Sequence, residues 1–128
     1  MDNRQQGVKI VAAAKQLPAY SKNTEEIIQF LDTWLDGREE RFVRKVKKIF
    51  QGAGVDKRYG IMSPEEVFTE TSFAQKNDIY AREVKKLGEG CLKKALSKAH
   101  WLPTDVDYII TVSCTGIMIP SLDAYLIN

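Results

Sequence analysis

The sequence lacks an apolar run long enough to cross a membrane, since a spanning helix needs about 20 predominantly apolar residues. Its first ten residues, MDNRQQGVKI, also lack the apolar core of a signal peptide. These two absences argue against a membrane protein and against export. They predict a protein of the cytoplasm.

Metal-ligating and nucleophilic side chains are also scarce. The chain has two cysteines, Cys91 and Cys114, and one histidine, His100. The cysteines form no CxxC pair, so we expect no metal site and no bound cofactor. A disulfide is not expected in a reducing compartment. Lys and Arg (19) nearly balance Asp and Glu (17), so the overall charge gives no argument for a nucleic-acid partner.

What the chain does contain is alternating strand and helix patterns over 128 residues, the size of one domain at most. No repeat, low-complexity tract or linker interrupts them. The predicted elements are a strand at 8–14 buried on both faces, helices at 24–36 and 38–51, an extended piece at 55–61, a helical turn from 63, a helix at 72–99, a strand at 108–112 and a helix from 121. This order predicts an α/β fold in which the two longer strands pair in parallel through a crossover.

Apolar residues at helical spacing predict which faces of the two longer helices are buried. In the long helix, Gly88 lies on the apolar stripe, where it would let another backbone approach closely. The predicted stripes are Phe42, Val46, Ile49 and Phe50 in the helix at 38–51, and Ile79, Tyr80, Val84, Leu87, Cys91, Leu92, Ala95 and Ala99 in the helix at 72–99.

The last strand and turn are the most informative stretch. An apolar run from Tyr108 to Val112 ends on Ser113, Cys114 and Thr115, and the chain turns at Pro120. This pattern is typical of a buried strand that enters a loop. Because ligands of α/β sheets lie beyond the carboxyl ends of strands, we expect the site near residues 114–120.

Cys114 has two interpretations. As a nucleophile its thiol would need a base or a positive environment, and no histidine lies nearby in the sequence. The alternative is a small pocket-lining residue, which we favour. Cys91 and His100 are interpreted as a core residue and a helix-end residue.

A basic helix face is the second candidate site, formed by Arg41, Arg44, Lys45 and Lys48. The simplest interpretation is a solvated surface. The alternatives are a phosphate-binding site and, more weakly, a nucleic-acid site, because no aromatic residues are interleaved with the charges.

The segment VSCTGIMIPSLDAYL, residues 112–126, resembles the chalcone synthase (type III polyketide synthase) family. The resemblance covers nearly all of this chain but only the N-terminal part of the family's longer chain. It implies that residues 1–128 are a single partial domain of a thiolase-like αβαβα fold with a mostly parallel or mixed sheet. It also implies that Cys114 and Thr115 line the active site, and that Ile119 reaches across a dimer interface into the partner's cavity.

The resemblance extends to Gly54-Val55-Asp56-Lys57-Arg58-Tyr59 and the basic helix before it. Aligned on Arg58 and Tyr59, Lys45 and Lys48 fall on two positions that bind coenzyme A in the family. The third usual position is Gly52, which has no side chain for a phosphate.

The family condenses acyl-CoA starters with malonyl-CoA by decarboxylative Claisen chemistry. Its catalytic cysteine, histidine and asparagine belong to segments that would follow Asn128, so this chain holds no catalytic residue and is expected to be inactive alone. Its uncovered apolar surfaces would favour a homodimer or a higher assembly.

Two alternatives remain open. A β-ketoacyl carrier-protein synthase III fragment shares the turn at Ala53-Gly54-Val55, but such enzymes typically carry a Thr-Pro stretch in place of Cys114-Thr115-Gly116. A non-catalytic module that binds a phosphorylated ligand or a partner would need only the basic helix.

Overall fold

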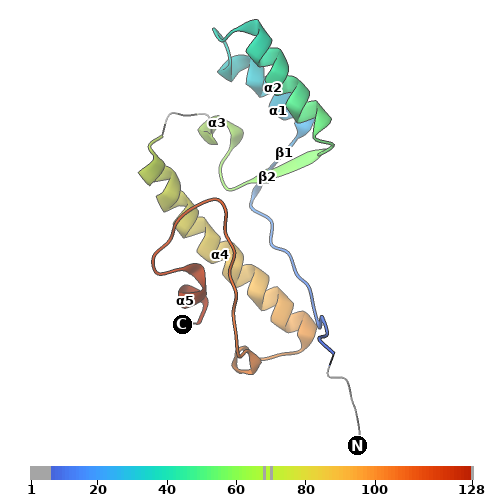
Figure 1. Ribbon diagram of the computed structural model, residues 1–128, viewed down its shortest axis with the longest axis vertical. Helices are drawn as coiled ribbons and strands as arrows, with labels where there is room; N and C mark the ends of the chain where they lie inside the picture. The colour runs from blue at the N-terminus through green and yellow to red at the C-terminus, as the bar shows by residue number, and fades with distance from the viewer. Residues whose placement is uncertain (1–6, 68, 70, 128) are drawn as a thin grey trace, which may run out of the picture. The chain divides into compact units, whose positions relative to one another are not determined.

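A computed structural model describes residues 7–67, 69 and 71–127 (Figure 1), which divide into two compact units. The hairpin unit is Leu17–Ser72. The long-helix unit joins the described residues of Met1–Gln16 to those of Phe73–Asn128. Within the described residues, no helix has both the length and the apolar composition that crossing a bilayer requires.

The hairpin unit contains a two-stranded sheet with helices between and after its strands. Strands β1 (Tyr20–Asn23) and β2 (Lys57–Gly60) pair antiparallel, with Tyr20 opposite Gly60 and Asn23 opposite Lys57. Its helices are α1 (Thr24–Trp34), α2 (Glu40–Gly52) and the short α3 (Pro64–Val67). The extended piece at 55–61 was predicted, whereas β1 was not, because its four residues carry no alternating pattern and precede a helix cap.

Helix starts in this unit agree with the capping signals in the sequence. Asn23 N–H donates to Glu26 Oε2 at 2.8 Å at the start of α1, and this backbone hydrogen bond is the main cause that lowers the pKa of Glu26. At α3, Ser63 N–H donates to Glu66 Oε2 at 2.8 Å and Glu66 N–H donates to Ser63 Oγ at 3.3 Å. These hydrogen bonds satisfy backbone donors that the start of a helix leaves free, and at α3 they form a reciprocal pair.

The core of the hairpin unit centres on Leu31 of α1, which is 2% exposed. The predicted stripe of α2 is half wrong, because Phe42 and Ile49 are 49% and 65% exposed. Val46 and Phe50 are partly buried as predicted. The partly buried face of α2 is narrow and follows Val43, Val46 and Phe50 at i, i+3 and i+7, so Phe42 and Ile49 fall outside it.

Arg58 of β2 ties the sheet to both long helices of this unit. Its Nη1 donates to the Val55 carbonyl oxygen at 3.2 Å and to the Thr24 hydroxyl. The guanidinium also lies 4.8 Å from the centroid of the Phe50 ring. One side chain therefore contacts the β2 entry, the start of α1 and the end of α2.

Replacing Arg58 by alanine should lower the free energy of unfolding of the hairpin unit by about 2 kcal/mol, because charged hydrogen bonds and a cation–π contact are lost together. Lys48→Ala is the matched control, since Lys48 on α2 makes no hydrogen bond or ion pair with other described residues. Urea unfolding followed by the fluorescence of Trp34, in a Trp101→Phe background, measures this unit. Equal midpoints for the two variants would contradict the prediction.

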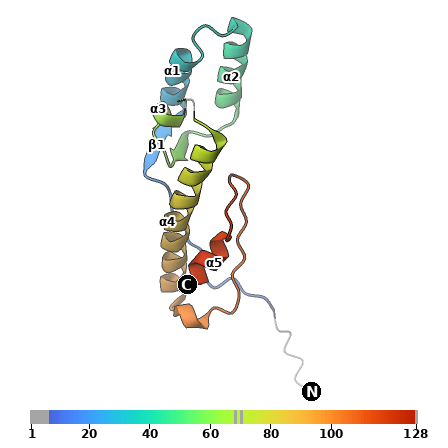
Figure 2. The same ribbon diagram turned by 90° about the vertical axis from the view of Figure 1, so that its left-hand side faces the viewer.

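The long-helix unit is built on α4 (Phe73–Ala99), followed by the 3₁₀ turn η1 (Pro103–Asp105) and the short α5 (Leu122–Ile127). The predicted stripe of α4 is confirmed in that its members are all partly buried. Helix α5 packs beside α4 at Gly88 (Figure 2), where an added Cβ would lie 3.3 Å from Leu122 and 3.7 Å from Leu126. The group that approaches Gly88 is thus a pair of leucine side chains, not a backbone.

The two predicted longer strands are extended segments that pair with no strand of the described residues. Residues 8–14 carry exposed Val8 and Ile10, and residues 108–112 expose Tyr108, Ile110 and Val112 on one side. The predictions of a parallel pair and of burial on both faces are therefore wrong for this unit. Each segment has only one covered side. The 8–14 segment is tied to α4, since Ala14 O accepts from Cys91 Sγ at 3.4 Å and Ala13 O from Lys98 Nζ at 3.0 Å.

Candidate functional site

A hollow of about 400 Å³ lies in the long-helix unit where the 108–112 segment ends. Its wall combines small polar groups from the turn with apolar and aromatic side chains from α4 and α5. The residues that line it are Tyr80, Val84, Thr111, Val112, Ser113, Cys114, Thr115, Gly116, Met118, Ser121 and Leu122. We expected a site near residues 114–120, and the hollow is the candidate for it.

The turn rests directly on Tyr80 of α4. The Tyr80 hydroxyl and Ser113 Oγ share a hydrogen bond of 2.5 Å. The Tyr80 ring lies against Gly116 so closely that a Cβ at position 116 would come within 3.0 Å of three ring atoms. Tyr80 was predicted only as a core residue, because its spacing on α4 gives no sign that it touches a turn more than thirty residues away.

The three residues expected to line an active site are placed differently. Cys114 and Thr115 stand side by side on the wall of the hollow, with Cys114 Sγ 3.9 Å from Thr115 Oγ1. Ile119 does not line the hollow and is 91% exposed. No imidazole or amine bonds the Cys114 thiol within the described residues, so the nucleophile interpretation gains no support. The described residues also hold no group of three side chains suited to a metal ion.

Asp123 fixes the junction between the 108–112 segment and α5. Thr111 Oγ1 donates to Asp123 Oδ1 at 3.1 Å, and the Ser121 hydroxyl donates to the same oxygen. The Ser121 hydrogen bond is the largest cause that lowers the pKa of Asp123 below 3.8, followed by backbone amides and Thr111.

The lowered pKa of Asp123 predicts a specific dependence of stability on pH. Because the folded pKa lies below the unfolded one, the ionised carboxylate favours folding above pH 3.8, and this contribution is lost as pH falls through the folded value. The urea concentration at the midpoint of unfolding should therefore fall less in Asp123→Asn than in the wild type as the pH is lowered into the acid range. Asp78→Asn, at an exposed position of α4, is the control. An equal fall in Asp123→Asn and the wild type would contradict the assignment.

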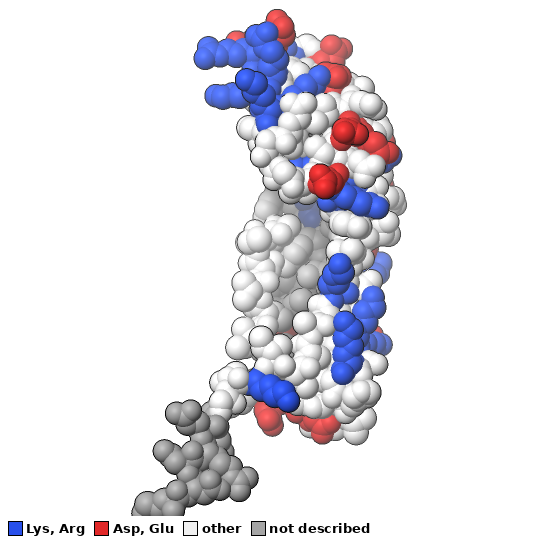
Figure 3. Space-filling view, turned by 90° about the vertical axis from the view of Figure 1, so that its right-hand side faces the viewer, with Lys and Arg blue, Asp and Glu red and all other residues white. Residues whose placement is uncertain are grey.

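The basic face lies on α2 in the other unit. Figure 3 shows Lys and Arg side chains gathered at the top of the view, over the helices of the hairpin unit. Arg44 pairs with Glu40 at 3.2 Å, whereas Lys45 and Lys48 make no hydrogen bond or ion pair with other described residues. Lys45 and Lys48 are exposed and one turn apart, so both ammonium groups are available to an anion.

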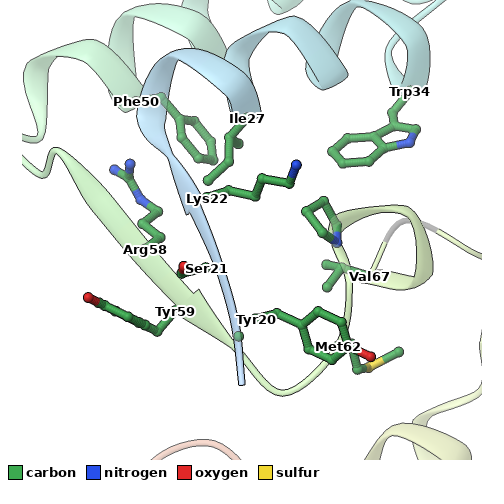
Figure 4. Close-up of a pocket in the computed structure, with 12 residues that line it drawn as sticks. Tyr20, Ser21, Lys22, Ile27, Trp34, Phe50, Arg58, Tyr59, Met62 and Val67 are labelled. Atoms are coloured by element: carbon green, nitrogen blue, oxygen red, sulfur yellow. The ribbon is translucent and has the colours of Figure 1, made fainter. Parts of the chain in front are cut away.

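A second hollow, of about 200 Å³, lies in the hairpin unit and is lined mainly by apolar side chains. Figure 4 shows Ile27, Trp34 and Val67 around it. The two basic side chains that line it, Lys22 and Arg58, already have partners. Lys22 Nζ lies 3.6 Å from Glu26 Oε1, and Arg58 has the contacts described above. It offers no convergent polar groups and we assign it no chemistry.

Comparison with known proteins identifies relatives of one kind. Over 81 residues, 63% of this chain, it is 40% identical to a 1,3,6,8-tetrahydroxynaphthalene synthase of Streptomyces coelicolor, covering 22% of that protein. It is 30% identical to a phloroglucinol synthase of Pseudomonas fluorescens over 64% of this chain and 24% of that protein. A putative chalcone synthase of Bacillus subtilis is 26% identical over 93% of this chain and 34% of that protein. No protein-family model matches the chain.

Solved structures of type III polyketide synthases also match the chain. The crystal structure of the Streptomyces coelicolor 1,3,6,8-tetrahydroxynaphthalene synthase, a bacterial type III polyketide synthase, matches 91% of this chain and 33% of its own, with a TM-score of 0.81 and 30% identity. A fungal type III polyketide synthase matches 92% of this chain and 32% of its own, with a TM-score of 0.79 and 20% identity, which supports the fold alone.

These matches define the class first: the chain has the fold of part of a thiolase-like α/β enzyme, as predicted. More narrowly, the chain is similar to type III polyketide synthases, and it spans about a fifth to a third of the length of the relatives it matches (22% to 34%). The named relatives favour this family over the carrier-protein synthase and the binding module.

Proposed function

We propose that this chain forms the N-terminal part of a type III polyketide synthase, an acyltransferase that joins an acyl-CoA starter to malonyl-CoA by decarboxylative Claisen condensation. The observation that carries the proposal is the match of 91% of the chain to such an enzyme at 30% identity. The small polar wall at Cys114 and Thr115 supports it, because an acyl chain needs a cavity with few and small polar groups.

In this proposal the two units have separate tasks. Cys114 and Thr115 line the cavity that receives the acyl chain. Lys45 and Lys48 bind the phosphates of coenzyme A, for which two ammonium groups one helical turn apart, neither of them paired with another described residue, are suited. Ile119, almost fully exposed, contributes to the partner's cavity in a homodimer.

The chemistry itself is assigned to residues outside this chain. Condensation needs a thiolate paired with a base, and donors that stabilise the enolate oxygen. The described residues offer an exposed Cys114 without a base and one histidine, His100, in the turn that ends α4. We also propose that residues 1–128 are one partial domain that binds CoA thioesters, uses no resident cofactor and works in the cytoplasm.

Calorimetric titration with coenzyme A tests the proposal on the chain itself. Coenzyme A should bind more tightly than dephospho-coenzyme A, and the affinity should fall as salt rises, because phosphate–ammonium contacts are screened. Malonyl-CoA should not be consumed. Release of CO₂ from malonyl-CoA with acylation of Cys114 would contradict the assignment of catalysis to other residues, and no difference between the two nucleotides would contradict the phosphate site.

Gly52 lies where the chalcone synthase family usually has a third coenzyme A-binding side chain. Supplying that side chain tests whether the affinity for coenzyme A rises. Gly52 is the last residue of α2, and an added Cβ there meets nothing within 4 Å. Gly52→Lys should therefore be accommodated and should bind coenzyme A severalfold more tightly, since a third cation joins Lys45 and Lys48. Gly52→Gln is the uncharged control. The same gain in both variants would show that charge is not its cause.

A further inference from the structure

The turn that forms the cavity wall is attached to α4 through both backbone polar groups of one residue, Ile117. Asn77 Nδ2 donates to the Ile117 carbonyl oxygen at 2.8 Å, and Ile117 N–H donates to Asn77 Oδ1 at 2.8 Å. Ile117 belongs to no helix or strand. A carboxamide side chain can make this paired contact because it carries a donor and an acceptor on one carbon.

Apolar burial contributes little at this point, because Ile117 is 63% exposed. The second attachment of the turn is the Tyr80 contact with Ser113 and Gly116. Asn77 and Tyr80 are three residues apart and so are neighbours on the surface of α4. The turn is therefore fixed at Ser113 and at Ile117 to one face of one helix, and Cys114 and Thr115 lie between the two attachments.

We propose that Asn77 is a positioning residue, which sets where Cys114 and Thr115 stand on the cavity wall and thereby the shape that an acyl chain meets. Asn77 is not among the residues that line the hollow, so it acts only through the turn. The inference rests on the proposed function insofar as it takes this hollow as the acyl cavity. It assigns part of the selection among acyl groups to a side chain that need not touch them.

Amide hydrogen exchange of the 128-residue chain, resolved by NMR, tests the attachment without any substrate. In Asn77→Ala the Ile117 amide should exchange about tenfold faster or more, since it loses its acceptor. Asn77→Asp keeps the acceptor but not the donor and should restore part of the protection. Lys76→Ala, an exposed neighbour on α4, should change nothing. The Gly88 amide, inside α4 against α5, should keep its rate in all three variants.

Two exchange results would overturn the inference: an Ile117 rate unchanged in Asn77→Ala, or equal acceleration at Ile117 and Gly88, which would mean that Asn77 only stabilises the unit. A small thioester, S-butanoyl-N-acetylcysteamine, tests the cavity separately. It should shift the Thr115 amide resonance in the wild type and less in Asn77→Ala. Equal shifts in both would overturn the effect on cavity shape. A shift in neither, with the exchange result intact, would reject the proposed acyl cavity and leave Asn77 holding the turn.

Discussion

Replacing Gly116 by alanine should lower the free energy of unfolding of the long-helix unit by about 2–3 kcal/mol, the upper range for overpacking. The added methyl group would lie within 3.0 Å of three atoms of the Tyr80 ring. The ring cannot move aside freely, because its hydroxyl is bonded to Ser113 in the same turn. The turn and the ring must then separate, and the hydrogen bond is lost with the contact.

The measurement is urea unfolding followed by the fluorescence of Trp101 in a Trp34→Phe background. Gly90→Ala is the matched control, because the three atoms nearest to its Cβ would all belong to the Gln16 side chain, at an ordinary contact distance of 3.4 Å or more. Alanine should stabilise that position by up to about 1 kcal/mol, since it is a better helix former than glycine.

A double-mutant cycle then identifies the cause. If the clash with Tyr80 destabilises Gly116→Ala, the substitution should cost much less in a Tyr80→Ala background, with a coupling energy of about 1–2 kcal/mol. Additive effects would mean that the ring does not limit position 116. Cavity shape and stability are linked here, because the same ring supports the turn and lines the hollow.

Local signals in the sequence predicted the helices well. Asn23 with Glu26 and Ser63 with Glu66 begin helices where they were expected, because a cap depends only on residues three apart. The turn that lines the hollow was predicted for a similar reason. The change from an apolar run to Ser113, Cys114 and Thr115 marks a chain turn whatever covers the segment before it.

The predictions that were wrong concern contacts between residues that lie far apart in the sequence. Residues 8–14 and 108–112 have strand composition, yet a strand exists only where a second backbone accepts and donates its hydrogen bonds, and the described residues supply none. Exposed Tyr108, Ile110 and Val112 alternate with partly buried Ile109 and Thr111 along this segment. Continuous apolar composition therefore predicted two covered faces where this chain covers one.

The contacts of Asn77 and Tyr80 with this turn were missed for the same physical reason. Their partners Ile117 and Ser113 lie 40 and 33 residues away, and nothing in a single sequence connects them. A polar Asn in the first turns of a long helix is ordinary, since such residues are tolerated near helix starts. Only the three-dimensional structure shows that its amide is used by a turn and not by the helix.

Reversing two charges on α2 should weaken coenzyme A binding about tenfold to a hundredfold at low ionic strength, because Lys45→Glu/Lys48→Glu removes two charge-assisted contacts and adds repulsion. The fold should tolerate both changes, since neither lysine bonds another described residue. Arg44 and Lys47 keep their partners Glu40 and Asp32 in this variant. The loss of affinity would then come from the ligand contact alone.

The matched control carries the same change in net charge on a different helix. Lys86→Glu/Lys93→Glu alters two exposed residues of α4. In the wild-type chain the ammonium group of each pairs with a glutamate. If coenzyme A is held at α2, this control should lose affinity only through the general field, which salt screens within about 10 Å at 0.1 M. Equal losses in both pairs of variants would show that net charge, and not a phosphate site on α2, governs binding. An affinity unchanged in Lys45→Glu/Lys48→Glu would place the nucleotide elsewhere.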